Sequence, residues 1–125
     1  MSRNLAPRCA DRRPFAWWVV SLEAQGTVMT VEGELDFASS GRFAADLAAL
    51  GADATQVIVD MAGVGFIDAT AVGAMLSVRQ LFATWGVTLS VRAPSRQVRR
   101  VFGLCEIDHL IGPPDVGTAA VELAG

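Results

Sequence analysis

The feature that most restricts the fold of this chain is the run QVIVDM at residues 56–61. It is short, almost continuously apolar and rich in β-branched side chains. Such a run is typical of a central strand that is covered on both faces and pairs in parallel with a neighbour. A parallel neighbour requires a crossover connection, usually a helix, so this run predicts an α/β fold.

The residues before this run predict an antiparallel hairpin and one helix. Residues 17–23 and 27–33 are strand-like segments separated only by Ala24-Gln25-Gly26. Ser39 or Ser40 is expected to cap the following helix, which Gly51 should end. The apolar face of that helix has a helical period and comprises Phe43, Leu47 and Leu50.

A longer helix is expected to begin at Asp68 and to stop at Gly86. Its apolar stripe comprises Ala71, Met75, Val78, Phe82 and Trp85. We assign Met75, Phe82 and Trp85 to the core rather than to a cofactor site, because their spacing is that of one helix face.

The remaining residues predict two further strands and two further helices. Residues 87–91 form a strand, and Pro94 opens a helix. The apolar face of this helix comprises Val98, Val101, Phe102 and Cys105. A short strand at Leu110-Ile111 and a last helix at Val116–Leu123 complete the chain.

These elements predict a single α/β domain with a mixed sheet of four to five strands, an N-terminal antiparallel hairpin and about four helices. The length of 125 residues suits one domain, and an apolar fraction of 52% is ample for a core. The first strand carries Trp17 and Trp18, which are expected either to pair with another strand or to pack on the last helix. Both alternatives stay open.

Charge is distributed unevenly along the chain. Residues 1–14 carry a net charge of +3 and the rest of the chain −6, for a total of −3. This balance argues against nucleic acid as a direct partner. Residues 1–14 are predicted to be a disordered basic arm and residues 15–125 the folded domain. The apolar run 15–20 is too short to span a membrane and has no cleavage motif after it, so we expect a cytoplasmic protein with no membrane segment.

Few residues could carry catalysis. The chain has no Lys, which excludes a Walker-type phosphate loop and a Schiff-base lysine. Its one histidine, His109, lies in a predicted short strand with no nucleophile motif beside it. Cys9 and Cys105 have no metal or redox spacing. We expect no cofactor, no metal and no enzymatic activity, which favours a binding module.

One helix presents a basic face, formed by Arg96, Arg99 and Arg100. It is interpreted as a solvated helix face, with a docking patch for an acidic partner as the alternative.

Four stretches, in this order and at these spacings, resemble the STAS domains of bacterial anti-sigma factor antagonists. They are GELD at 33–36, VIVD at 57–60, GFID at 65–68 and AVG at 71–73. The resemblance extends from about Trp17 to the C-terminus. It implies a protein that binds a GHKL-type serine kinase, itself an anti-sigma factor, and so frees a sigma factor for RNA polymerase. It also implies a switch, in which the kinase phosphorylates a hydroxyl at the start of the long helix and a phosphatase removes the phosphate.

The chain departs from the family at the phosphate acceptor. The family sequence after the aspartate is Ser-Ser-Gly-Leu-Gly, and the first serine is the usual acceptor. Here Ala69 stands at that position and Thr70 at the second serine. Ala71, Val72 and Gly73 follow at the positions of Gly, Leu and Gly. Thr70 is therefore the candidate phosphorylation site, and the alternative is a hydroxyl that bonds only to nearby backbone.

The predicted partner-binding surface comprises Asp36, Asp68, Ala69, Thr70, Ala71, Val72 and Gly73. Asp68 is expected to cap the long helix, and Asp36 to share a surface with it. Two alternatives to the switched antagonist remain. One is a constitutive, non-phosphorylatable STAS interaction module, and the other is the STAS subunit of a lipid-transport ABC system. Nucleotide binding lacks the glycine-rich loop that would support it.

Overall fold

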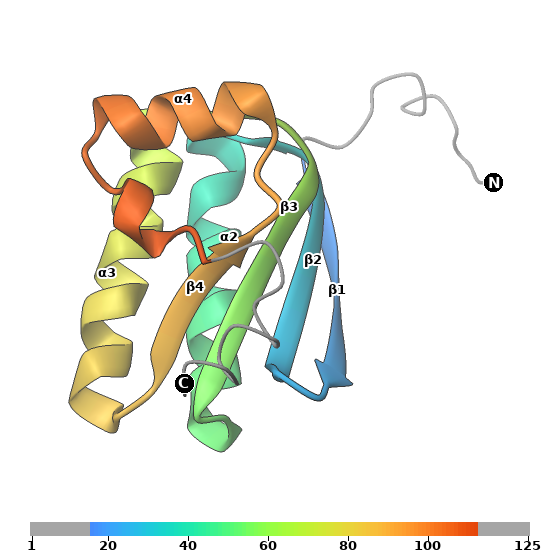
Figure 1. The fold of residues 1–125 in the computed structure, drawn as a ribbon, viewed down its shortest axis with the longest axis vertical. Coiled ribbons are helices and arrows are strands. Elements are labelled where there is room, and N and C mark those ends of the chain that lie inside the picture. Colours follow the sequence, from blue (N-terminus) through green and yellow to red (C-terminus); the bar gives the residue numbers. More distant parts are fainter. Residues whose placement is uncertain (1–15, 113–125) are drawn as a thin grey trace, which may run out of the picture.

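The computed structural model describes residues 16–112, which fold around one four-stranded sheet (Figure 1). The strands, in sheet order, are β1 (Ala16–Glu23), β2 (Gly26–Leu35), β3 (Gln56–Ile67) and β4 (Thr88–Arg92). The helices are α2 (Phe37–Leu50), α3 (Ala69–Trp85) and α4 (Arg96–Leu104). β1 and β2 are antiparallel, whereas β2, β3 and β4 are parallel. The mixed α/β fold and the hairpin are confirmed. The arm at 1–14 and the helix at 116–123 lie outside the described residues.

Helices α2 and α3 pack side by side on one face of the sheet, and α4 lies across one end (Figure 1). Between helices and sheet lies one apolar core, in which the predicted side chains Phe43, Met75 and Phe82 are fully buried. Trp85 was wrongly assigned to this core, since it is 49% exposed. It is the last residue of α3, and its ring lies against Phe82 at 6.1 Å between centroids.

β3 continues beyond the predicted run as far as Ile67 and contains two irregularities in its pairing with β2. Thr27 pairs with Val57 and Leu35 with Ile67, so β3 has two more residues than β2 over the same length. The shifts lie between Thr30 and Glu32 and between Gly33 and Glu34 of β2. Extra residues of this kind bend a strand and interrupt the alternation of its side chains between the two faces of the sheet. As a result β2 and β3 end at the same level, and Asp36 and Asp68 follow directly.

Several helix ends differ from the prediction. Asp36, not Ser39 or Ser40, caps α2, and Ser39 completes a capping box as the third helical residue. α4 is capped by Ser95, so Pro94 precedes the cap instead of opening the helix. Gly51 and Gly86 end α2 and α3 as expected, and Gly86 adopts φ +74°, which favours glycine.

The C-terminal part of the described chain differs from the prediction in two places. Cys105 is an exposed free thiol after α4 and does not belong to the apolar face of that helix. The strand expected at Leu110-Ile111 reduces to one bridge between Val91 and Ile111. A 3₁₀ turn over Asp108–Leu110 precedes this bridge and contains His109.

Trp18 packs against α2. Its ring meets Phe43 edge-on at 5.7 Å, its indole N–H donates to Asp46 at 2.9 Å, and the Arg42 guanidinium lies 4.6 Å from its centroid. Trp17, on the other face of β1, remains half exposed.

Candidate functional site

Asp68 joins the starts of the two long helices. Its Oδ1 accepts a hydrogen bond from the Ala71 N–H at 3.0 Å, which caps α3 as predicted. Its Oδ2 accepts from the Phe37 N–H, the first residue of α2, also at 3.0 Å. The Asp68 N–H donates to the carbonyl oxygen of Leu35 at 3.1 Å, which ties the strand ends together. One carboxylate thus satisfies unpaired donors of two helices.

Asp36 lies beside it and caps α2. Its Oδ1 accepts from the backbone N–H groups of Ala38 at 3.0 Å and Ser39 at 3.2 Å. The Ser39 hydroxyl in turn accepts from the Asp36 N–H at 3.0 Å. Both carboxylates are half-buried. The arrangement brings Asp36 and Asp68 to one surface, at the end of the sheet where β2 and β3 finish.

The residues after Asp68 divide between surface and core. Ala69, Thr70 and Gly73 are exposed, whereas Ala71 and Val72 are buried in the core. The side chains of Ala71 and Val72 therefore cannot reach a partner in the folded chain. Within residues 16–112, no group hydrogen-bonds the Thr70 hydroxyl.

The ion pairs within residues 16–112 do not involve these two carboxylates. They join Arg92 to Asp60 at 2.9 Å and to Glu23 at 3.2 Å, across the sheet. The hydrogen bond that Arg92 donates to Glu23, with a second one to Asp60, raises the pKa of its guanidinium, while burial opposes the rise. Arg96, Arg99 and Arg100 are exposed on α4. Over the described residues, neither Asp36 nor Asp68 has a cationic partner.

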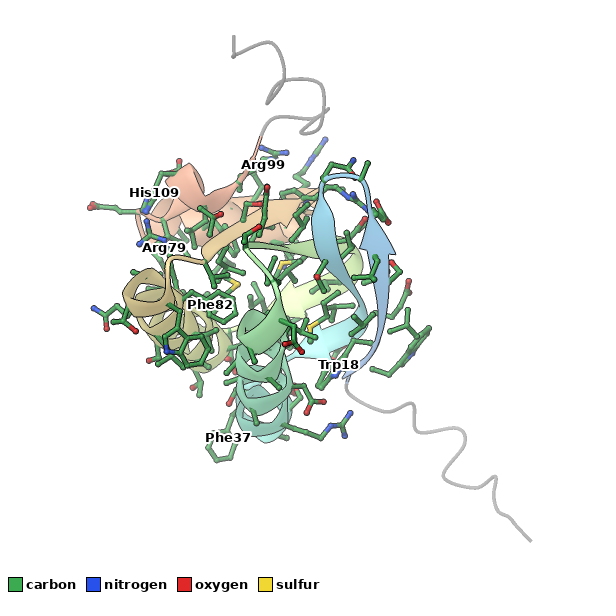
Figure 2. The ribbon with its side chains drawn as sticks, turned by 90° about the horizontal axis from the view of Figure 1, so that it is seen from below. Trp18, Phe37, Arg79, Phe82, Arg99 and His109 are labelled. Atoms are coloured by element: carbon green, nitrogen blue, oxygen red, sulfur yellow. The ribbon has the colours of Figure 1, made fainter. Side chains whose placement is uncertain are left out.

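Sequence reasoning missed an aromatic side chain at this surface. Phe37 is the first residue of α2 and is 77% exposed, and Phe66 at the end of β3 is 40% exposed. Figure 2 shows the Phe37 ring projecting from the outer side of α2. The sequence did indicate this exposure, because Phe37 falls outside the apolar helical stripe that contains Phe43 and Leu47 and faces the core.

Across residues 16–112, no helix has the length and apolarity needed to cross a membrane. The same residues contain no cluster of three or more His, Cys, Asp or Glu side chains arranged to hold a metal ion. What the surface offers is two capped helix starts, two carboxylates, one free hydroxyl and an exposed ring. These groups suit binding.

Comparison with known proteins defines the class. The STAS domain family model matches residues 20–120, so the chain belongs to the STAS domain family. A search of curated proteins by sequence found no match.

Solved structures with this fold include anti-sigma factor antagonists and anion transporters. An anti-sigma factor antagonist from Mycobacterium paratuberculosis superimposes with a TM-score of 0.73 at 18% identity, covering 88% of this chain and 95% of that one. The anti-sigma factor antagonist SpoIIAA in its unphosphorylated form superimposes with a TM-score of 0.69 at 18% identity, covering 85% of this chain and 96% of that one. Phosphorylated SpoIIAA from Bacillus has a TM-score of 0.64 at 17% identity, covering 86% of this chain and 99% of that one. The murine anion transporter Slc26a9 gives 0.64 at 21%, with 77% of this chain matching 18% of that one. At these identities the likeness concerns the fold.

Proposed function

We propose that this protein is an anti-sigma factor antagonist that binds a GHKL-type anti-sigma kinase and so frees a sigma factor. The observation that carries the proposal is the double hydrogen bond of Asp68, which fixes the starts of α2 and α3 as one surface. That surface contains the exposed members of the GFID and AVG motifs. Neighbours named as anti-sigma factor antagonists, matched over nearly their whole length, support the same role.

The proposed chemistry of the chain itself is recognition. The kinase would contact Ala69, Thr70 and Gly73 on α3 together with the two aspartates. Small side chains on α3 permit close approach, and the carboxylates attract basic groups of the partner. Direct nucleic acid contact is not part of the proposal.

The proposed switch is phosphorylation of Thr70. Its exposed hydroxyl would attack the γ-phosphorus of ATP in the kinase site, giving phosphothreonine and ADP as the hydroxyl proton leaves to a base of the kinase. The phosphate would add roughly −1.5 to −2 charge beside Asp68 and within the contact surface. A loss of about 3 kcal/mol by repulsion and desolvation would weaken the complex roughly 100-fold. A phosphatase would restore binding. Ala69, at the usual acceptor position, has no hydroxyl.

The test of binding is affinity purification with the whole chain as bait, followed by identification of the retained protein. A GHKL-type kinase supports the proposal. Recovery of an ABC ATPase in its place would overturn it in favour of a lipid-transport role.

The test of the switch uses that purified kinase with ATP and intact-mass spectrometry. We expect one phosphate on the wild-type chain and none on Thr70→Val. Thr70→Glu should lower affinity for the kinase at least tenfold. If Thr70→Glu binds the kinase with wild-type affinity and Thr70 gains no phosphate, the switch is wrong and the protein is a constitutive antagonist.

A further inference from the structure

Among residues 16–112, Phe37 has the most exposed aromatic side chain. Its backbone is fixed, since its N–H donates to Asp68 at 3.0 Å as the first residue of α2. Its side chain is 77% exposed and projects from the helix (Figure 2). A rigidly mounted aromatic side chain is the kind of group that dominates binding energy at the centre of interfaces.

Two glycines lie one helical turn after the first residues of α2 and α3. Gly41 follows Phe37 by four residues on α2, and Gly73 follows Ala69 by four residues on α3. On both helices this spacing places the glycine on the same face as the first helical residue. The two helices pack side by side, so the glycines extend the surface that starts at Asp36 and Asp68.

Nothing within the described chain requires glycine at these two positions. Neither adopts a positive φ, and a Cβ at either position would meet no atom within 4 Å. Glycine also destabilises a helix interior relative to alanine. Gly51 differs, because a Cβ there would collide with the Phe82 ring. Gly41 and Gly73 therefore leave the backbones of α2 and α3 uncovered next to Phe37 and Ala69, where a partner could approach them closely.

The charge of this surface indicates the chemistry of that partner. Asp36 accepts its hydrogen bonds through Oδ1, and within residues 16–112 no group donates to its Oδ2. The nearest basic residue along α2, Arg42, has its guanidinium over the Trp18 ring. A complementary partner would present an apolar pocket for the ring, bordered by Arg or Lys side chains.

We propose that Phe37 is the anchor enclosed by the anti-sigma kinase, and that Gly41 and Gly73 are kept free of side chains so that the kinase backbone can approach α2 and α3. The contact surface thereby extends from α3 onto α2. This inference rests on the proposed function and names the contact residues of the same site.

Matched variants separate binding from folding. Phe37→Ala should weaken binding to the purified kinase at least 30-fold in calorimetry, whereas Leu104→Ala, at a side chain 79% exposed on α4, should change it less than twofold. Gly41→Ala and Gly73→Ala should weaken binding at least tenfold while the Tm stays equal or rises. Gly103→Ala on α4, where a Cβ also meets nothing within 4 Å, is the control that should leave binding unchanged.

Cross-linking in cells separates failure of this surface from failure of the proposed function. p-Benzoylphenylalanine at position 37 should cross-link to a GHKL-type kinase, and at position 104 it should not. If the wild-type chain retains the kinase but position 37 gives no cross-link and the alanine variants bind normally, the surface is wrong and the function stands. A cross-link from position 37 to a different protein, with no kinase retained, overturns the function and the occupant proposed here. If no kinase is retained and position 37 gives no cross-link, both the proposed function and the proposed contact surface are overturned.

Discussion

Replacing Asp68 by alanine should destabilise the fold through two helices at once. The change removes the cap of α3, worth about 1 kcal/mol. It also removes the acceptor of the Phe37 N–H, a bond worth about 1 kcal/mol because this exposed N–H can bond water instead. We expect the free energy of unfolding to fall by about 2 kcal/mol, and Tm by roughly 10 °C for a domain of this size.

Asp68→Asn should cost about half as much, because its amide offers one oxygen for two N–H donors. Urea denaturation followed by far-UV circular dichroism measures both values. Hydrogen exchange of the Phe37 amide should accelerate in Asp68→Ala. The exposed Asp53, which accepts no side-chain hydrogen bond from residues 16–112, is the control, and Asp53→Ala should change stability by less than about 0.5 kcal/mol. A change below about 0.5 kcal/mol in Asp68→Ala would refute the idea that one carboxylate holds the two helices.

Other substitutions test other parts of the fold. Arg92→Met should lower stability by about 1–2 kcal/mol in urea denaturation, because it strands the partly buried Asp60 carboxylate. Since the pKa of Arg92 is raised, its contribution holds throughout the range below its unfolded pKa, and stability measured at pH 6 and at pH 9 should show the same loss. Phe82→Ala should cost about 3–4 kcal/mol and Trp85→Ala less than about 1 kcal/mol, so similar losses would place Trp85 in the core after all. Gly86→Ala should cost about 1 kcal/mol in thermal unfolding because of its positive φ, and an unchanged Tm would contradict that strain.

Local patterns were enough to predict the order of the elements from β1 to α4. The run at 56–61 identifies the central strand, and the stripe from Ala71 to Phe82 identifies the core face of α3. The cap at Asp68 and the left-handed end at Gly86 are also local features, and both are confirmed. Periodicity and helix-end chemistry depend on neighbours in sequence, which a single chain shows directly.

Features that depend on neighbours in space could not be predicted in this way. The length of β3 is set by its pairing with β2, and the glycines at 63 and 65 hide the strand pattern. The second bond of Asp68 requires Phe37 to lie beside it, and these residues are 31 apart in the sequence. Ala71 and Val72 were included in the predicted surface by motif position, but the helix rotates them into the core.

The two extra residues of β3 have a consequence for engineering the protein. They set the height at which α3 begins, so deleting one residue between Ala62 and Phe66 should lower the start of α3 by about 3 Å and separate Asp68 from Phe37. The β1–β2 turn at Ala24-Gln25 lies at the opposite end of the sheet (Figure 1). A label, linker or surface tether inserted in that turn would leave the starts of α2 and α3 accessible.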